Sequence, residues 1–192
     1  TAIQQLQQLQ FPLEFHQLDV TDPTSIETLK NHLQQKYNKI DILINNAGIF
    51  PSGMNNLSIF NVDIDTIKEA MDTNTYGPLQ LIQALVPIMN HNARIINISS
   101  GMGQLSQMDS SYPAYRLSKT GLNVITKLVA EELKENTNIS INSVCPGWVK
   151  TDMGGPRAPK SVVEGADTII WLALIDNPPT GGFYQDRQKI EW

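Results

Sequence analysis

The sequence predicts an α/β fold in which a parallel sheet carries helices on both faces. Apolar stretches with the length of strands alternate with stretches of helical period along the 192 residues. Two strand-like stretches, residues 40–44 and 94–98, are apolar almost throughout, which is typical of parallel strands covered on both sides. Small polar or turn-forming residues follow the predicted strands in succession, and in an open α/β sheet ligands bind at that edge.

Composition and charge limit the class of protein. With 41% hydrophobic residues the chain can bury one substantial core, so we expect a single domain over residues 1–192. The net charge of -5, without a cluster of lysine and arginine, argues against a nucleic-acid partner. The apolar runs are too short to span a membrane, and no secretion leader is visible. The lone Cys145 and three scattered histidines predict a cytoplasmic protein without a disulfide or a metal site.

The first part of the chain predicts a helix, a strand and a second helix. Residues 1–10 are rich in glutamine and carry apolar side chains at helical spacing. Residues 13–18 form a short strand-like run. Asp22 then has the side chain of an N-cap and Pro23 suits a first helical residue, and the helix continues to about Tyr37. The inner face of this helix is expected to consist of Ile26, Leu29 and Leu33.

The middle of the chain predicts two buried strands on either side of a long helical segment. Residues 40–44 form the first strand, and an irregular polar stretch over residues 49–61 follows. Residues 63–90 have a helical pattern in which the Gly-Pro pair at 77–78 marks a break or kink. Residues 94–98 form the next strand.

The last part predicts a long helix and a final set of shorter elements. After a loop to Ser111, the helix carries a broad apolar face made of Leu117, Leu122, Val124, Ile125, Leu128, Val129 and Leu133. So broad a face packs on both a sheet and a partner, and we expect a homodimer or homotetramer formed through the helices 63–90 and 112–135. The remaining expected elements are a strand over residues 139–145, a surface loop over 151–159, a helix over 161–174 and a short strand over 182–184.

Tyr115 and Lys119 form the pair of residues to which we first assign chemistry. Their spacing places both side chains on one face of a helix. An ammonium beside a phenol favours the phenolate and lowers the pKa of the phenol, so the pair can act as a general acid or base. A Tyr-x-x-x-Lys pattern also arises by chance in chains of this composition. Ser100, fifteen residues earlier and at the end of a predicted strand, can place a hydroxyl beside the phenol.

Motifs along the whole chain resemble those of the short-chain dehydrogenase/reductase family, in particular its carbonyl-reductase-like members. They follow the family's order at near-family intervals: Leu18-Asp19-Val20, Asn45-Asn46-Ala47-Gly48, Asn74, Ser99-Ser100, Tyr115-x-x-x-Lys119 and Pro146-Gly147-Trp148-Val149-x-Thr151. Together these motifs are highly specific. The resemblance implies a doubly wound, Rossmann-type sheet and a nicotinamide-dependent oxidoreductase.

The resemblance also implies a set of catalytic residues. Tyr115 would donate a proton to a carbonyl during reduction and accept one from an alcohol during oxidation. Lys119 would lower the pKa of the phenol and hold the nicotinamide ribose. Ser100 would donate a hydrogen bond to the substrate oxygen as charge develops there. Asn74 would keep a water relay ordered behind the lysine.

The same resemblance implies a cofactor site and a substrate class. Asp19 and Val20 match the adenine contact, and Asn46, Ala47 and Gly48 match the segment along the adenosine ribose. The nicotinamide carboxamide and phosphate contacts fall on Val149 and Thr151, after the turn at Pro146 and Gly147. The cofactor would be NADP or NAD, and NADP is favoured because carbonyl-reductase-like relatives mostly use it. The substrate would be a small carbonyl compound or the corresponding alcohol.

The sequence departs from the family pattern at its beginning. The glycine-rich phosphate loop and the second strand of the family are not found in these residues. In the family's strand order, 3-2-1-4-5-6-7, residues 13–18 would be the third strand and residues 40–44 the fourth, and these two are not neighbours. A gap in the centre of a sheet would leave backbone groups unpaired. We therefore expect roughly forty further residues before Thr1 in the intact protein, about the length of a strand-helix-strand unit.

Two alternatives stay open at this stage. A truncated or degenerate family member would keep the scaffold for binding or assembly without redox chemistry, and the missing phosphate loop favours this reading. An isomerase or dehydratase of the extended relatives is disfavoured, because their C-terminal domain needs more chain than residues 154–192 provide.

Overall fold

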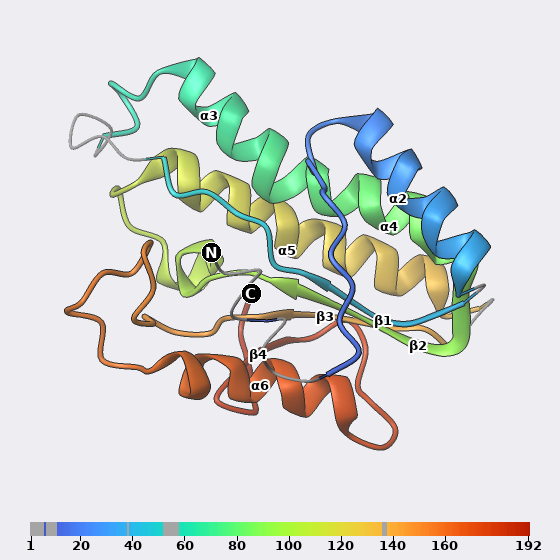
Figure 1. The fold of residues 1–192 in the computed structure, drawn as a ribbon. Coiled ribbons are helices and arrows are strands. Elements are labelled where there is room, and N and C mark those ends of the chain that lie inside the picture. Colours follow the sequence, from blue (N-terminus) through green and yellow to red (C-terminus); the bar gives the residue numbers. More distant parts are fainter. Residues whose placement is uncertain (1–5, 7–10, 38, 52–57, 136–137) are drawn as a thin grey trace.

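The described residues form a five-stranded sheet between two layers of helices (Figure 1). The computed structural model describes residues 6, 11–37, 39–51, 58–135 and 138–192. In sheet order the strands are β1 (Ile40–Asn45), β2 (Met89–Ile98), β3 (Ser140–Val144), β4 (Phe183–Gln185) and β5 (Gln188–Ile190). The first four are parallel and β5 is antiparallel to β4. The predicted α/β fold with a parallel sheet is therefore confirmed.

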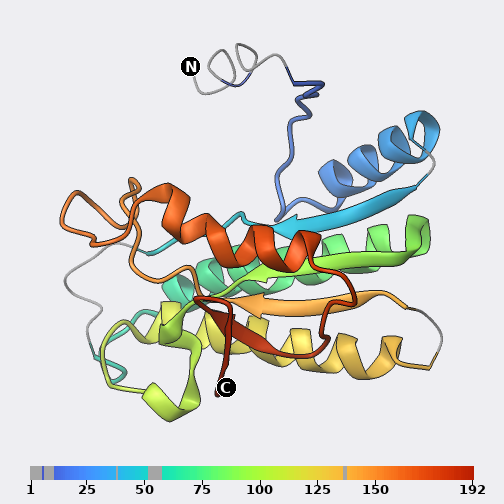
Figure 2. The same ribbon diagram turned by 90° about the horizontal axis from the view of Figure 1, so that it is seen from below.

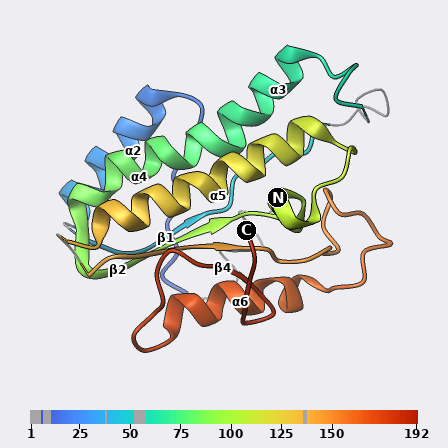
Figure 3. The same cartoon turned by 180° about the vertical axis from the view of Figure 1, so that it is seen from behind.

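Helices cover the two faces of the sheet unequally. One face carries α2 (Pro23–Lys36), α3 (Ile64–Met71), α4 (Gly77–Leu85) and α5 (Pro113–Leu133), and the other carries α6 (Val162–Leu174). The view from behind shows the same two layers (Figure 3). The α6 layer packs through Leu172 and Ala173 against Ile96, Val144 and Tyr184. The core on this face consequently lies over β2, β3 and β4.

Helix α2 follows directly from its local sequence. The Asp22 carboxylate accepts a hydrogen bond from the Thr24 N–H at 2.9 Å, and Pro23 is the first helical residue. Ile26 is buried, and Leu29 and Leu33 pack beside it against α4. The predicted cap, start and inner face are confirmed.

The predicted strand over residues 13–18 is wrong, because these residues belong to no ladder. A strand needs a neighbour for its N–H and C=O groups, and no strand of the described chain lies beside this segment, which runs past the carboxyl end of β1 (Figure 2). It is held to α2 instead, because the Glu14 carboxylate accepts from Lys36 Nζ at 2.6 Å and contacts His32 Nε2 at 2.9 Å. The helix predicted over residues 1–10 falls, apart from Leu6, outside the described residues.

Strand β1 is an edge strand with one face open. Ile40 and Leu43 pack into the core beneath α2 and α4, whereas Ile42 and Ile44 on the opposite face are 38% and 44% exposed. The expected burial of this strand on both sides is therefore wrong on the α6 side, since α6 reaches only as far as β2.

The predicted helix over residues 63–90 is divided by a π-helical turn at Asp72–Tyr76. Pro78 has no N–H to bond the carbonyl four residues earlier, and the N–H of Gly77 bonds the carbonyl of Asp72, five residues back. A break near the Gly-Pro pair is confirmed. The helical segment ends at Ile88, and the next two residues already belong to β2.

The C-terminal elements agree with the prediction except for one strand. Ser161 caps α6 with a capping box, in which its hydroxyl accepts from the Glu164 N–H and the Glu164 carboxylate accepts from the Ser161 N–H. Strand β5 was not predicted. It pairs with β4 through a two-residue turn in which Asp186 and Arg187 both have positive φ, at 51° and 59°. Asp-Arg is not a usual dipeptide for such a turn, so no turn signal marks this hairpin.

Candidate active site

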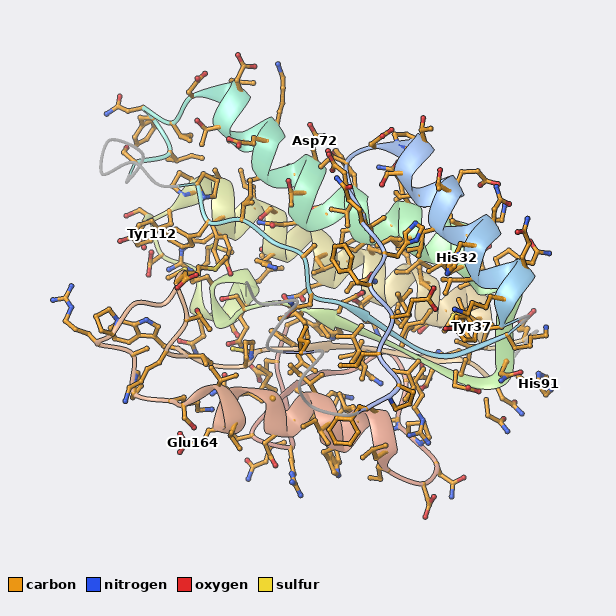
Figure 4. The ribbon with its side chains drawn as sticks, in the orientation of Figure 1. His32, Tyr37, Asp72, His91, Tyr112 and Glu164 are labelled. Atoms are coloured by element: carbon orange, nitrogen blue, oxygen red, sulfur yellow. The ribbon has the colours of Figure 1, made fainter. Side chains whose placement is uncertain are left out.

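The carboxyl ends of the central strands meet at one edge of the molecule. In Figure 4, His91 near the beginning of β2 lies at the opposite end of the molecule from Tyr112 and Glu164. The turns that follow the strands touch there, because Cys145 Sγ accepts from the N–H of Gly101 at 3.1 Å and of Gly147 at 3.4 Å. The turns after β2 and β3 therefore meet at this edge, whereas Asp19, which was expected to follow a strand, follows none.

Tyr115 and Ser100 lie together at this edge. Tyr115 is in the first turn of α5 and is 9% exposed, and the Ser100 side chain interacts with its hydroxyl and lowers the pKa of the phenol. The Ser100 oxygen also accepts from the Met102 N–H at 3.2 Å. The ring of Tyr115 packs against Phe50, with 4.6 Å between the ring centroids. The side chains of Ser100 and Tyr115 therefore lie together beside the ring of Phe50.

Lys119 lies one helical turn beyond Tyr115 and is 5% exposed. Its Nζ donates to the carbonyl of Ile98 at 2.8 Å and lies 5.7 Å from the centroid of the Tyr115 ring. Burial lowers the pKa of the Lys119 amine to about 8. The fold thus buries an amine whose charge is costly at neutral pH.

The pKa of Tyr115 is raised, and the expectation that Lys119 lowers it is wrong for this structure. Burial is the main cause of the increase, the hydrogen bond from Ser100 opposes it, and the neighbouring Cys145 adds to it. The physical reason is that the Lys119 amine is directed at the Ile98 carbonyl rather than at the phenol oxygen. At neutral pH the Tyr115 hydroxyl therefore keeps its proton.

Asn74 joins the segment after β1 to helix α5. It lies fully buried in the π-helical turn, where its Oδ1 accepts from the Ile49 N–H and its Nδ2 donates to the Ile49 carbonyl, each at 2.8 Å. The Nδ2 also donates to Ser118 Oγ at 3.0 Å. A Cβ on Gly48 would lie 3.2 Å from the Asn74 oxygen and 3.5 Å from Lys119 Nζ. Glycine at position 48 is what lets the chain pass so close to both side chains.

The residues predicted to bind a cofactor lie along this edge in separate places. A pocket is lined by Leu18, Val20, Ile44, Asn45, Asn46, Ala47, Pro78 and Leu81. Asp19 does not line this pocket, because its carboxylate accepts from the N–H and hydroxyl of Thr21 at 2.9 Å and 2.7 Å. Thr151 lines a second, open hollow with Lys150, Asp152, Gly155 and Pro156.

The loop after the Pro146-Gly147 turn is held by Lys160. The Lys160 N–H donates to the Trp148 carbonyl at 3.2 Å, its carbonyl accepts from the Lys150 N–H at 2.9 Å, and its Nζ contacts the Pro146 carbonyl at 3.5 Å. Val149, between these contacts, accepts from the Thr151 N–H at 2.9 Å. The segment that carries Pro146, Gly147, Val149 and Thr151 is therefore fixed against the start of α6.

Sequence reasoning missed the contacts of two residues at the site. The contact of Arg116 with the preceding loop has no sequence signal. Cys145 was expected to be a buried thiol, but its hydrogen bonds to two turns depend on contacts between distant segments.

The described residues contain neither a metal-binding cluster nor a membrane-spanning helix. Histidine, cysteine and carboxylate side chains do not gather in threes at metal-binding distance within that part of the chain. Its helices are each too short or too polar to cross a membrane.

A parallel α/β sheet with a serine, a tyrosine and a buried lysine at its carboxyl edge is an arrangement found in nicotinamide-dependent oxidoreductases. A family model described as short chain dehydrogenase matches residues 1–161, and the chain belongs to this family. Carbonyl reductase (NADPH) 1 of Mus musculus is 31% identical over 242 aligned residues, which cover 100% of this chain and 84% of that protein.

Solved structures agree with the family assignment. The NADPH-bound carbonyl reductase from chicken fatty liver has a TM-score of 0.87 and 29% identity, covering 100% of this chain and 82% of its own. The carbonyl reductase Sniffer of D. melanogaster has a TM-score of 0.88 and 28% identity, covering 100% and 83%. The predicted resemblance to carbonyl-reductase-like members and the Rossmann-type fold are confirmed.

Proposed function

We propose that the protein is a carbonyl reductase that transfers a hydride between NADP(H) and a small carbonyl compound. The observation that carries this proposal is the placement of the Ser100 side chain beside the buried Tyr115, where it lowers the pKa of the phenol, with the buried Lys119 one turn away. The names of the relatives favour NADPH over NADH, since the mouse and chicken proteins are described with NADPH.

The residues along the sheet edge fit parts of a dinucleotide. Val20, Asn46 and Ala47 line a pocket suited to the adenosine end, with Asp19 beside it, and Gly48 leaves room where a side chain would collide. On the nicotinamide side we assign Lys119 and the segment with Pro146, Gly147, Val149 and Thr151. The 192 residues contain no glycine-rich loop between a strand and a helix for the diphosphate. NADPH, when bound, supplies the hydride.

The protein's own groups handle the proton and the orientation of the substrate. In our proposal the Ser100 hydroxyl holds the substrate oxygen, and the Tyr115 hydroxyl gives that oxygen its proton. A raised pKa of Tyr115 suits this direction, because the phenol is protonated at neutral pH. The reverse reaction needs the phenolate and is expected to be faster at higher pH.

Lys119 and Asn74 support the two hydroxyls from behind. Lys119 is fixed by the Ile98 carbonyl, which sets the position of its amine toward a bound ribose. In our proposal Asn74 keeps a water relay ordered behind Lys119. Its side chain also ties the backbone of Ile49 to α5 through Ser118, so it positions the segment that begins with Asn46.

Apolar side chains near the site favour an apolar substrate. Phe50 packs against Tyr115 and Tyr112, with centroid distances of 4.6 Å and 5.0 Å. Trp148 and Met153 are exposed on the loop after β3. We therefore assign an apolar aldehyde or ketone as the substrate class.

Two further assignments concern partners and location. On α5, Leu117, Val124 and Leu128 are 45%, 52% and 64% exposed, and we assign this face to a second copy of the chain in a homodimer or homotetramer. The thiol of Cys145 is free and buried, which suits a reducing compartment such as the cytoplasm.

The test is an assay of NADPH oxidation with a panel of aldehydes and ketones, on the protein and on two tyrosine variants. Tyr115→Phe is expected to lower kcat by about 10²–10⁴-fold, the usual contribution of a general acid, with unchanged NADPH affinity because the ring stays against Phe50. Tyr184→Phe removes the hydroxyl of another buried tyrosine, on β4, and should leave kcat unchanged. Full activity of Tyr115→Phe would refute the assigned role.

The alternative is a non-catalytic scaffold that uses the same fold for binding or assembly. Titration of the protein with NADPH and with NADH, followed by cofactor fluorescence, separates the two. Binding of neither cofactor would support the scaffold, whereas binding of NADPH would support the reductase.

A further inference from the structure

Residues 101–112 connect β2 to α5 and separate Ser100 from Tyr115. Two short 3-10 turns, Gly101–Gly103 and Leu105–Gln107, begin this connection. Residues 105–110 are all exposed, so apolar packing contributes little to holding them in place. The conformation of the connection depends instead on polar contacts.

The guanidinium of Arg116 makes three of these contacts. Its side chain is 6% exposed. Its Nε donates to the carbonyl of Ser111 at 2.7 Å, its Nη1 to the carbonyl of Met102 at 3.3 Å, and its Nη2 to the Asp109 carboxylate. One buried charge thus binds the connection near its beginning, at Met102, and at two residues toward its end, Asp109 and Ser111. A buried guanidinium requires such acceptors, so the contacts are favoured together.

One of these contacts leads directly to Ser100. The Met102 carbonyl accepts from Arg116, while the Met102 N–H donates to Ser100 Oγ at 3.2 Å. The backbone on both sides of Met102 is therefore fixed, and with it the acceptor geometry of the serine hydroxyl. The same serine side chain interacts with the Tyr115 hydroxyl.

The other end of the connection is strained, and Arg116 supports it as well. Tyr112 adopts the left-handed conformation, with φ 50° and ψ 52°, which is unfavourable for a side chain other than glycine. Its carbonyl accepts from the Arg116 N–H at 3.0 Å, and the preceding carbonyl, of Ser111, accepts from Arg116 Nε. Tyr112 also packs on Phe50, which packs on Tyr115.

We propose that Arg116 is a positioning residue, which acts through the 101–112 connection to hold the Ser100 hydroxyl at the Tyr115 hydroxyl. This inference rests on the proposed reductase function. The Arg116 side chain binds Met102, Asp109 and Ser111, and its influence on the reaction passes through them. These contacts together form an anchor for the connection, and Asp109 is its solvent-exposed member. The second carboxylate oxygen of Asp109 accepts from the Ser111 N–H at 2.7 Å and from the Ser111 hydroxyl at 2.5 Å.

Asp109→Asn is the main test, because the Asp109 side chain is 62% exposed and its replacement does not threaten the core. The amide can keep the contacts with Ser111 while it presents an NH2 group to the guanidinium. Asp167→Asn is the matched control. It breaks the pair between Asp167 and Arg187, whose side chains are 46% and 55% exposed on α6 and the β4–β5 turn.

In NADPH-dependent reduction, Asp109→Asn and Arg116→Lys are expected to lower kcat by about ten- to a hundredfold, the effect of a small misplacement of reacting groups. The Kd for NADPH should change by less than about twofold, and Asp167→Asn should leave both unchanged. A second measurement uses the Ser100→Ala background. Since Asp109 acts through Ser100, Asp109→Asn should lower kcat little further there, whereas independent roles would give additive losses.

Amide hydrogen exchange of residues 101–112 tests the anchor without reference to activity. Exchange should accelerate in Asp109→Asn and stay unchanged in Asp167→Asn. Unchanged exchange in Asp109→Asn, or full kcat together with faster exchange, would overturn the inference. A wild-type protein that shows no NADPH-dependent reduction would refute the proposed function, and the positioning role of Arg116 in that reaction with it, whatever the exchange shows.

Discussion

The burial of Lys119 predicts that the stability of the protein rises with pH above neutrality. Burial lowers the pKa of this amine from its ordinary value of 10.5 to about 8 in the folded protein. Between these two pH values the unfolded chain binds the proton and the folded protein does not. The free energy of unfolding therefore increases with pH across this window.

The size of the increase follows from the shift. Each unit of pKa difference corresponds to about 1.4 kcal/mol. Across the full window the free energy of unfolding therefore rises by about 3 kcal/mol, and from about pH 7 to about pH 9.5 it rises by about 2 kcal/mol. The side chain is 5% exposed, so solvent screening reduces this value little. Lys119→Met removes the buried charge but leaves the Ile98 carbonyl without its donor, which costs about 1–3 kcal/mol. The two effects of this replacement largely offset each other near neutral pH.

The assay is urea denaturation of the wild-type protein and of Lys119→Met, without cofactor, from about pH 7 to about pH 9.5. All other titrating groups are common to the two proteins and cancel in the difference. The wild-type protein should gain about 2 kcal/mol relative to the variant over this range. Parallel stability curves would refute the reasoning, because they would mean that the fold does not perturb the titration of Lys119.

Three further predictions test single contacts by urea denaturation. Asp22→Ala removes the N-cap of α2 and should cost about 1 kcal/mol; no loss would contradict the cap. Gly103→Ala should cost about 1–3 kcal/mol, because its Cβ would lie 2.8 Å from the Lys119 backbone; a neutral effect would mean that the turn yields. Asn74→Ala leaves the partly buried N–H and C=O groups of Ile49 without their side-chain partner and should cost about 1–3 kcal/mol and weaken NADPH binding; unchanged fluorescence titrations would refute the link to the cofactor segment.

Those elements whose causes are local could be predicted from the sequence. Asp22 followed by Pro23 starts α2, and Ser161 with Glu164 starts α6, because a cap needs only residues within one turn. The buried strand at residues 94–98 was equally clear, since a parallel strand in the centre of a sheet needs apolar side chains on both faces.

The errors concern pairing between distant segments. Residues 13–18 have the pattern of a strand, but a strand exists only where a neighbour offers hydrogen bonds, and no local pattern specifies one. β5 is the opposite case. Its sequence pattern is weak, but it forms a strand because β4 provides a pairing partner across the Asp186-Arg187 turn. Ile42 and Ile44 were expected to be covered, and their exposure depends on how far α6 extends across the sheet.

At the site, the spacing in the sequence predicted that Tyr115 and Lys119 lie close together, but it did not predict the direction in which the pKa of Tyr115 moves. The four-residue interval between Tyr115 and Lys119 correctly placed both on one helical face. The direction in which the pKa of Tyr115 moves depends on burial and on the Ile98 carbonyl that takes the lysine amine. That carbonyl belongs to β2, so its position is a property of how α5 lies on the sheet.

The way α5 lies on the sheet is itself set by polar contacts. Apolar packing alone would allow the helix to shift along the sheet at little cost, because dispersion contacts have no direction. The buried polar face of α5 removes that freedom: the Asn123 Nδ2 donates to the Gly103 carbonyl at 3.2 Å, and the Thr126 hydroxyl bonds Ser143 Oγ at 2.8 Å and accepts from Asn97 Nδ2 at 2.9 Å. Each of these hydrogen bonds is lost if the helix moves by a fraction of a turn, and a lost bond in the core costs about 1–3 kcal/mol. The meeting of the Tyr115 and Ser100 hydroxyls is therefore a consequence of the core, and the polar residues beneath α5 determine the geometry of the site.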